Sequence, residues 1–476
     1  MKAILHSIRI SKVREIKITA DELVKTLLNL SEKKQVCLLD SCNVSHLKSH
    51  LLIAGVNPFE VLEITNDDAE KTLEIFNEKL SQTDLAFIFT VSYNFGLKLE
   101  NIKPRKKEFA SFSEPDVFLA AFDCLIIHDY NAGKTFLTGN EKQFGEIEKM
   151  LDENLKAEKF NDSCRNEDVK ISSNFTRESY LQTIEKIQEY IRRGDTYQIN
   201  LTQQLRARLP ENLTAQKIFW RLRKSHPAPF AAFLKRNDDF VVSISPERFF
   251  KVQSSKFKDQ SRSIETSPIK GTRPRGNTAE EDLQLKIELL RSEKDRAENT
   301  MIVDLLRNDI GRICEFGTVE VEKLCDLEMH PTLFHLVSTV RGELKENITI
   351  ADILKAVFPC GSITGAPKIS TMQIIDELET TNRGLSMGAI GFSVQSSKFK
   401  VQSLENKIQP SAFSLQPCID VSVAIRTMVI KNQEAIFNVG GGIVIDSVPE
   451  DEFDESLLKA KALLQALGVV NQNEML

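Results

Sequence analysis

The chain has 476 residues, a formal net charge of −6, and 41% hydrophobic and 27% charged residues. This length accommodates two or three domains of ordinary size, or one large interleaved domain. The acidic balance argues against non-specific binding to nucleic acid, and no apolar run reaches the roughly 20 residues of a membrane span.

Cysteine usage and the first residues indicate the compartment. Eight cysteines stand at positions 37, 42, 124, 164, 314, 325, 360 and 418, without a CxxC pair or the spacing of a metal site. Scattered cysteines fit a reducing compartment better than a disulfide scaffold. The opening segment, MKAILHSIRISKVREIKITA, is too interrupted by charge for a signal peptide. We therefore expect a cytoplasmic protein, with neither nucleic acid nor membrane as a partner.

The first third of the chain, residues 1–165, predicts alternating strands and helices. Buried strands are expected at 36–39 and 85–91, and the segment 126–137 predicts a hairpin around Asn131 to Gly133. The polar stretch 157–174 predicts a linker to a second region at 170–468.

The second region opens with a predicted helix that ends at Gly194 and places four apolar residues on one face: Tyr180, Ile184, Ile187 and Ile191. Strands are expected at 197–205, 230–234 and 240–245, followed by a turn that contains Lys270 and by helices at 279–291 and 292–310. Further strands at 389–394, 419–430 and 435–439 lead to a last helix at 449–467.

The heptapeptide VQSSKFK occurs twice, at 252–258 and at 394–400. No fold-level repeat accompanies the two copies. Polar insertions at loop tips cost little closure entropy and are well tolerated. We interpret 252–262 and 394–417 as inserted loops without a catalytic role.

The run PIKGTRPRG at 268–276 surrounds Lys270 with basic neighbours and with residues that favour turns. Positive neighbours and partial burial both favour the neutral form of a lysine amine, which is the nucleophilic form. A solvated basic hairpin turn fits the same run, so its meaning depends on the rest of the chain.

Four further segments accompany this run in order: SPERF at 245–249, KDRAENTMIVDL at 294–305, GSITGAPK at 361–368, and AIRT at 424–427 followed by GGG at 440–442. Together they resemble the chorismate-utilising enzymes over roughly residues 170–468. The resemblance implies an α/β (α+β) fold whose core is a two-sheet antiparallel sandwich flanked by helices. It also implies that chorismate is the substrate.

The resemblance assigns two catalytic residues. Lys270 matches the lysine of the family, and Glu247 matches its general acid. A carboxyl group has to be protonated near neutral pH for that role, which burial can achieve. On local sequence alone, Glu247 also fits an exposed turn residue.

Substrate-binding residues also follow from the resemblance. Arg426 matches the clamp for the enolpyruvyl carboxylate, together with the backbone amides of Gly440, Gly441 and Gly442. The remaining matches are ring contacts and the motif histidine of the family: Thr364, Gly365 and His335. Glycine triplets are also common in tight turns, and a lone histidine is as often structural.

Two carboxylate pairs with i, i+3 spacing lie on predicted helices: Asp295 with Glu298, and Glu452 with Glu455. Oxygen ligands without nearby Cys or His suit Mg²⁺ rather than zinc. The resemblance makes Glu298 and Glu455 the direct Mg²⁺ ligands, with the other two acting through water. Such pairs are also common on solvated helix faces.

Two positions separate the members of the family. Anthranilate synthases have alanine where Lys270 stands, and isochorismate and salicylate synthases have a lysine where Gln198 stands. The pattern here resembles aminodeoxychorismate synthase component I, in which the lysine adds to ring carbon 2 and ammonia then attacks carbon 4. Three alternatives stay open: anthranilate synthase component I, isochorismate synthase, and a non-catalytic subunit that docks a glutaminase.

Two further expectations concern the source of ammonia and an effector site. None of the eight cysteines lies in a GxCxG motif, so ammonia has to come from a separate glutamine amidotransferase subunit or from solution. The product would feed para-aminobenzoate and folate synthesis. The segment LLDSC at 38–42 resembles the effector-binding LLES of anthranilate synthases, which makes Ser41 a candidate contact for tryptophan. A short apolar strand that ends in a turn serine fits the segment equally well.

Overall fold

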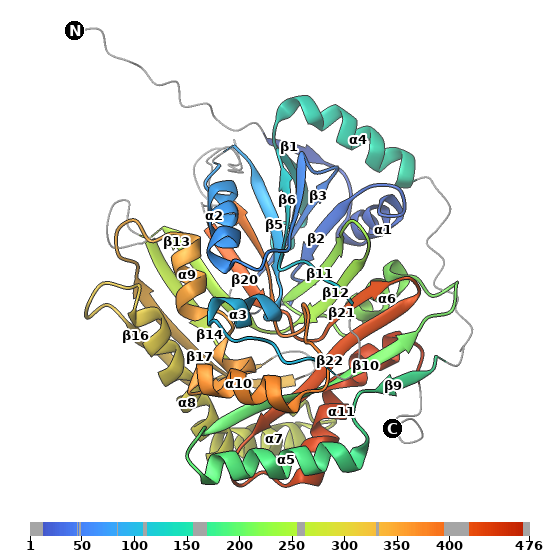
Figure 1. The fold of residues 1–476 in the computed structure, drawn as a ribbon. Helices are drawn as coiled ribbons and strands as arrows, with labels where there is room; N and C mark the ends of the chain where they lie inside the picture. The colour runs from blue at the N-terminus through green and yellow to red at the C-terminus, as the bar shows by residue number, and fades with distance from the viewer. Residues whose placement is uncertain are drawn as a thin grey trace, which may run out of the picture.

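The computed structural model describes residues 13–469, with the exception of 45, 47–48, 83, 108–111, 156–168, 255–261, 330–332 and 395–417. Within this part, two antiparallel sheets form the centre and helices cover their outer faces (Figure 1). This is the mixed α/β fold that the resemblance implied.

The first sheet has 12 strands in the described part, and it runs in the order β1-β8-β7-β3-β2-β11-β12-β21-β22-β10-β18, with β9 paired to β10. Their bounds are β1 Val13–Ile16, β2 Val36–Asp40, β3 Leu51–Val56, β7 Cys124–Asp129, β8 Lys134–Gly139, β9 Ile171–Ser173, β10 Gln198–Arg208, β11 Phe230–Lys235, β12 Phe240–Ser245, β18 Gly365–Ala366, β21 Thr427–Lys431 and β22 Glu434–Ile443.

The second sheet has 10 strands in the described part, in the order β15-β17-β14-β13-β20-β19-β5-β6-β4, with β16 paired to β17. Their bounds are β4 Glu60–Ile64, β5 Ala86–Val91, β6 Val117–Phe122, β13 Arg248–Ser254, β14 Arg262–Ser267, β15 Ile269–Pro274, β16 Glu320–Met329, β17 Leu333–Glu343, β19 Ala389–Val394 and β20 Cys418–Val423.

Alternation along single strands separates the layers of the core. On β5, Ile88 packs between the two sheets, whereas its neighbours Phe87 and Phe89 face the helices on the outer side. Successive side chains of a strand point to opposite faces, so a strand buried on both faces has an almost entirely apolar sequence. This explains the apolar run AFIFTV of β5.

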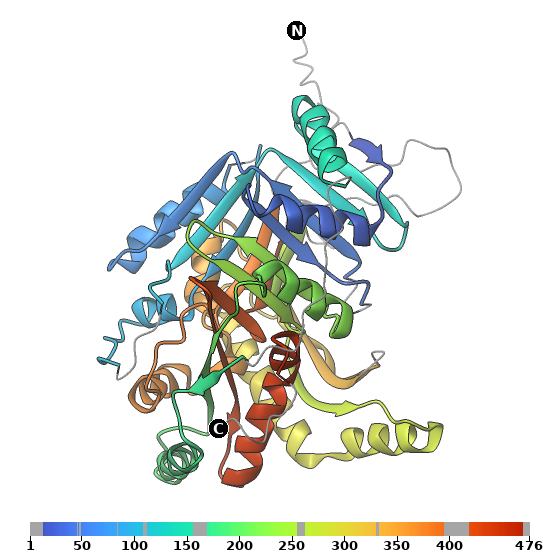
Figure 2. The same ribbon diagram turned by 90° about the vertical axis from the view of Figure 1, so that its right-hand side faces the viewer.

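The helices are α1 Ala20–Leu30, α2 Ala69–Leu80, α3 Tyr93–Leu99, α4 Glu141–Leu155, α5 Arg177–Arg192, α6 Ala215–Ser225, α7 Ala279–Arg291, α8 Glu293–Gly311, α9 Ile350–Val357, α10 Lys368–Leu378 and α11 Pro449–Ala466, with a short 3-10 helix at Gly361–Ile363. Figure 2 shows α5 and α11 at the end of the molecule opposite α4.

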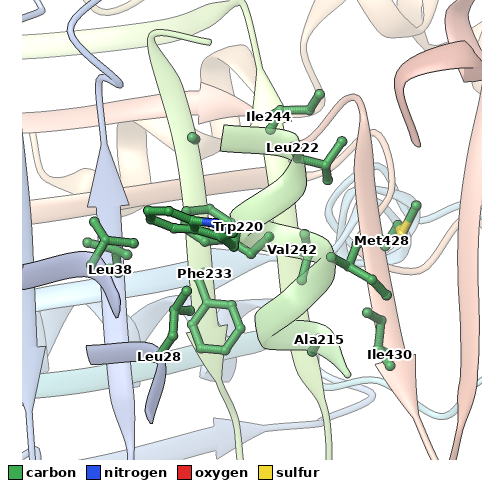
Figure 3. Close-up of a cluster of buried hydrophobic side chains, with 14 of the residues drawn as sticks. Leu28, Leu38, Ala215, Trp220, Leu222, Phe233, Val242, Ile244, Met428 and Ile430 are labelled. Carbon is green, nitrogen blue, oxygen red and sulfur yellow. The ribbon is translucent and has the colours of Figure 1, made fainter. Parts of the chain in front are cut away.

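Helix α6 illustrates how an outer layer is attached. The Thr214 hydroxyl accepts a hydrogen bond from the Lys217 amide and caps the first turn. The helix buries Trp220 and Leu222 in the same apolar cluster as Phe233 of β11 and Val242 of β12 (Figure 3). Truncation of a fully buried Phe such as Phe233 typically costs about 3–5 kcal/mol.

The two regions expected at 1–165 and 170–468 share both sheets. β2 pairs with β11 through Leu38 and Phe233, and β5 pairs with β19 through Ile88 and Phe392. The polar stretch proposed as a linker is described only at its end, where Ile171–Ser173 forms β9. Both VQSSKFK copies begin at the end of a strand of the second sheet and then continue outside the described residues.

Two local expectations were wrong. The strand expected at 419–430 is two strands in different sheets, because the chain leaves β20 after Val423 and enters β21 at Thr427. Arg426 lies between them with a φ of 48°. Lys270 was expected in a turn, but it lies inside strand β15, which pairs with β17 through Ile269 and Thr272 around an irregularity at Lys270 and Gly271.

Candidate active site

Lys270 is a largely buried residue on the strand β15. Its side chain is 14% exposed, and its Nζ lies 3.9 Å from Glu298 Oε2 on α8. Gly271 follows with a φ of 85°, and a Cβ there would lie 3.0 Å from the Asp295 side chain. The strand therefore approaches α8 closely at this point, which brings the lysine to the helix that carries Asp295 and Glu298.

The glycine triplet of β22 provides the space for the Lys270 amine. A Cβ at Gly442 would lie 2.5 Å from Gln198 Nε2 and 3.3 Å from Lys270 Nζ. Both atoms of the Gln198 amide are buried and have no hydrogen-bond partner among the described residues. Lys270 and Gln198, the two positions that separate the family members, thus meet over one glycine.

Glu247 lies beside this space and is 5% exposed. Burial raises the pKa of Glu247 to about 7, opposed by a hydrogen bond from Ser362, the charge of Lys270 and the Ile269 amide. Its Oε1 has no hydrogen-bond partner in the described part of the chain. A carboxyl group in this state holds a proton near neutral pH, as the role of general acid demands. Ser362 was not singled out from the sequence, although it lies within GSITGAPK.

The four expected metal ligands come from two helices. Glu452 and Glu455 of α11 lie near Gly441, where a Cβ would be 3.4 Å from Glu452 and 3.7 Å from Glu455. Glu298 and Asp295 of α8 lie close enough for the charges of Asp295 and Glu452 to act on Glu298. The sequence-predicted pairs thus lie in one neighbourhood.

Positive side chains neutralise these carboxylates. Lys459 lies 2.7 Å from Glu455, Lys294 lies 3.4 Å from Glu452, and Arg273 lies 3.3 Å from Asp295. Burial raises the pKa of Glu298, opposed by Lys270 and Lys294. Burial acts on Glu455 in the same direction, but Lys459, Lys294 and Lys270 together outweigh it and lower the pKa of that carboxyl.

The donor atoms suit a hard cation, but the carboxylates are not drawn together. All four groups offer oxygen, which is the ligand type that Mg²⁺ prefers. In the ranges that the structure describes, no three or more His, Cys, Asp or Glu side chains are placed as if to hold a metal ion. The residues therefore fit Mg²⁺ by their chemistry, and lysines together with Arg273 are their present counterions.

Arg426 is a partly buried cation without an acidic partner in the described structure. Burial lowers the pKa of its guanidinium, and no carboxylate offsets this effect. A partly buried guanidinium without a counterion loses part of its hydration, and a bound anion would compensate for this loss. This arrangement suits the carboxylate of a ligand.

The GSITGAPK segment forms a compact turn. The Thr364 hydroxyl donates to the Cys360 carbonyl at 3.0 Å, so this side chain is used inside the turn. Gly365 has a φ of 150°, and a Cβ there would lie 1.9 Å from the Gln198 carbonyl oxygen. The segment thus packs directly against the start of β10.

His335 on β17 is 4% exposed and shares a 2.8 Å hydrogen bond with the Thr272 hydroxyl of β15. Its cross-strand partner is Thr272, and Thr272 follows Lys270 by two residues. His335 therefore supports the strand of the lysine from the neighbouring strand.

Ser41 borders a separate cavity of about 240 Å³ between the two sheets. The cavity is lined by Asp40, His50, Phe230, Arg248 and other residues, and Lys270 and Glu247 are not among them. The Ser41 hydroxyl is buried and has no hydrogen-bond partner in the described residues. A second small-molecule site is compatible with these features.

The chain is similar to proteins of a known family. The chain matches the family described as chorismate binding enzyme over residues 34–401 and 412–465. This chain belongs to the chorismate-binding enzymes. In the described residues of this family member, no helix is both long and apolar enough to cross a membrane.

Two curated relatives of this chorismate-binding enzyme carry different names. It is 36% identical over 373 residues to "Anthranilate synthase component 1" of Aquifex aeolicus, which covers 75% of this chain and 70% of the relative. It is 34% identical over 407 residues to "Aminodeoxychorismate synthase component 1" of Bacillus subtilis, which covers 83% and 80%.

A solved structure agrees with the fold. Anthranilate synthase component I from Streptococcus pneumoniae superposes with a TM-score of 0.71 at 28% identity, covering 88% of this chain and 93% of that one. Because the relatives are named for two different reactions, the site residues have to indicate which reaction this chain carries out.

Proposed function

We propose that this chain is the component 1 of an aminodeoxychorismate synthase, which converts chorismate and ammonia to 4-amino-4-deoxychorismate. The observation that carries the proposal is the meeting of Lys270 Nζ and Gln198 Nε2 over Gly442, with Glu247 beside them. This combination provides a nucleophilic amine and a protonated acid, and it lacks a second lysine at position 198.

The reaction balances in two displacements. The neutral Lys270 amine adds to ring carbon 2, the double bonds shift, and the carbon 4 hydroxyl leaves as water with the proton from Glu247. Ammonia then adds to carbon 4, the double bonds shift back, and the Lys270–carbon 2 bond breaks. A covalent lysine intermediate divides one difficult substitution into two easier ones.

The charged groups of the site support binding of a dianion. Arg426, partly buried and without a carboxylate partner among the described residues, suits the enolpyruvyl carboxylate, with the amides of Gly440 to Gly442 as further donors. Glu298 and Glu455 would hold Mg²⁺ directly, with Asp295 and Glu452 in support. When bound, this ion supplies positive charge for the ring carboxylate.

Two further parts belong to the proposal. Ammonia comes from a separate glutamine amidotransferase subunit in the cytoplasm, and the product serves para-aminobenzoate and folate synthesis. The cavity at Ser41 takes a small effector such as tryptophan. The name "component 1" of the Bacillus subtilis relative supports a multi-subunit arrangement.

Product analysis tests the proposal. The purified chain is supplied with chorismate, Mg²⁺ and ammonium, and the products are separated by liquid chromatography with mass detection. Aminodeoxychorismate keeps the enolpyruvyl group, whereas anthranilate formation releases pyruvate, which a coupled lactate dehydrogenase assay measures. Pyruvate release in step with turnover would replace this proposal by anthranilate synthase. No turnover with ammonium would favour a non-catalytic docking subunit.

A further inference from the structure

Asn200 is a second buried amide with an unused donor in the site. The residue is 7% exposed, and its Nδ2 has no hydrogen-bond partner among the described residues. It lies two positions after Gln198 on β10, so both side chains are on the same face of the strand. Its cross-strand partner is Gly442, whose free space is bordered by Gln198 and Lys270. The Asn200 amide therefore belongs to the surroundings of the Lys270 amine.

Both backbone groups of Asn200 are fixed. Its N–H donates to the Thr364 carbonyl at 2.8 Å, and its carbonyl accepts from Arg383 Nη2 at 2.6 Å. Arg383 is fully engaged, because its guanidinium also pairs with Glu379 at 2.7 Å and donates to the Ile363 carbonyl at 2.8 Å. The backbone that carries the side chain is therefore held in place, which favours a binding role.

A neighbouring asparagine shows how a structural amide behaves in the same sheet. Asn438 of β22 is 3% exposed, and its Nδ2 donates to the Thr202 hydroxyl at 3.2 Å. Its Oδ1 accepts from Gln204 Nε2 at 3.3 Å. Buried amides are normally paired in this way, so a firmly held amide with a free donor indicates a missing ligand.

We propose that Asn200 is a further substrate-binding residue, whose Nδ2 donates a hydrogen bond to an oxygen of bound chorismate. The inference rests on chorismate as the substrate, as in the proposed function, and does not depend on which product forms. Arg383 and Glu379 act only as positioning residues, through the backbone of Asn200 and Ile363.

The test compares two isosteric substitutions, Asn200→Leu and Asn438→Leu, in a Lys270→Ala background and without ammonia, so that no turnover takes place. Chorismate binding with Mg²⁺ is measured by calorimetry and stability by thermal unfolding. Removal of an unpaired donor leaves stability equal or higher, whereas removal of a paired amide leaves its partners unsatisfied. We expect Asn200→Leu to weaken chorismate binding about 10-fold or more with an unchanged or raised Tm. Asn438→Leu should lower the Tm and leave binding within about twofold.

A chorismate Kd within about twofold of the parent for Asn200→Leu would overturn the inference. A lowered Tm for that variant would also count against it, because the donor would then be paired in the fold. If Asn200→Leu does not fold, Asn200→Asp replaces it; this substitution keeps the size, removes the donor and adds a negative charge, so binding should fall further. Wild-type chain that binds chorismate but releases pyruvate would contradict the proposed reaction and leave the role of Asn200 intact.

Discussion

The Lys270 amine and the Glu298 carboxylate are 3.9 Å apart, so the proposed nucleophile and a proposed metal ligand form one ion pair. Each group is the counterion of the other in this structure. A cation bound by Glu298 would compete with Lys270 for the same carboxylate. Metal binding and release of the Lys270 amine from this ion pair are thus expected to be linked.

The first prediction concerns Glu298. Glu298→Gln removes a charged oxygen ligand and should reduce Mg²⁺-dependent turnover at least about 100-fold while the fold remains. Glu293→Gln on the exposed face of the same helix is the control and should keep activity. Steady-state rates over a Mg²⁺ titration provide the measurement, and full activity of Glu298→Gln at limiting Mg²⁺ would refute the ligand assignment.

The second prediction concerns pH and Glu247. Because this carboxyl must be protonated to act as an acid, the rate should fall as the pH rises through its pKa of about 7. Glu247→Gln should remove this limb of the pH profile along with most of the activity. A wild-type rate that is constant from pH 6 to pH 8.5 would contradict the role of Glu247.

The same pKa has a consequence for stability. Glu247 binds its proton more tightly in the folded state, so stability falls as the pH rises from the usual value of 4.5 to about 7, and the loss persists above that. Glu247→Gln avoids this loss and should raise the free energy of unfolding at pH 8 by about 1–3 kcal/mol. Denaturant unfolding at pH 5 and pH 8 measures the free energy of unfolding of both proteins. An equal effect of the substitution at both pH values would show that burial does not raise the pKa of Glu247.

The third prediction separates aminodeoxychorismate synthase from anthranilate synthase. Lys270→Ala removes the covalent route, so aminodeoxychorismate formation should be almost lost and residual ammonia addition should shift toward carbon 2, giving some anthranilate. Lys270→Arg keeps a positive charge without a nucleophilic amine and should lose aminodeoxychorismate formation equally. Intact-protein mass spectrometry of the wild-type chain without ammonia should detect a chorismate adduct, and normal product formation by Lys270→Ala would exclude covalent catalysis.

The fourth prediction uses the three consecutive glycines of β22. A Cβ at Gly440 would lie 1.8 Å from the Leu201 carbonyl oxygen, so Gly440→Ala should destabilise the fold. At Gly442 the nearest atom would be Gln198 Nε2 at 2.5 Å, so Gly442→Ala should mainly reduce activity by displacing Gln198 and the Lys270 amine. At Gly441 the nearest atoms are 3.4 Å away, so Gly441→Ala should be the mildest. Thermal unfolding and turnover of the three variants would show whether this order holds.

The fifth prediction concerns the second inserted segment. The ends of β19 and β20 are cross-strand partners, Val394 opposite Cys418, so a short turn can join them. Deletion of Gln395 to Gln416 with such a turn should leave activity within about twofold and raise stability by about 1 kcal/mol through a smaller loop-closure cost. Loss of folding or a large loss of activity would show that the segment packs against the catalytic part of the chain.

Local patterns were sufficient for most single elements and for the grouping of the motif residues. Continuous apolar runs predicted β2 and β5, and a helical face predicted α5. The pairing of distant strands was not readable, because backbone hydrogen bonds between β2 and β11 leave no signature in either segment. The roles of Ser362 and Asn200 depend on burial and on unpaired atoms, which only coordinates reveal. Lys270 was misplaced in a turn because Gly271 indicates a bend without indicating that the strand continues past it.

The sharing of both sheets between early and late segments affects how the protein is made. On the ribosome, β5 emerges roughly 300 residues before β19, the strand that covers its edge. At about 5–20 residues per second, that edge waits about 15–60 s for its partner. The apolar strand AFIFTV is a natural substrate for chaperones during this interval. Recombinant production should therefore benefit from slow expression at low temperature more than from division of the chain near residue 165.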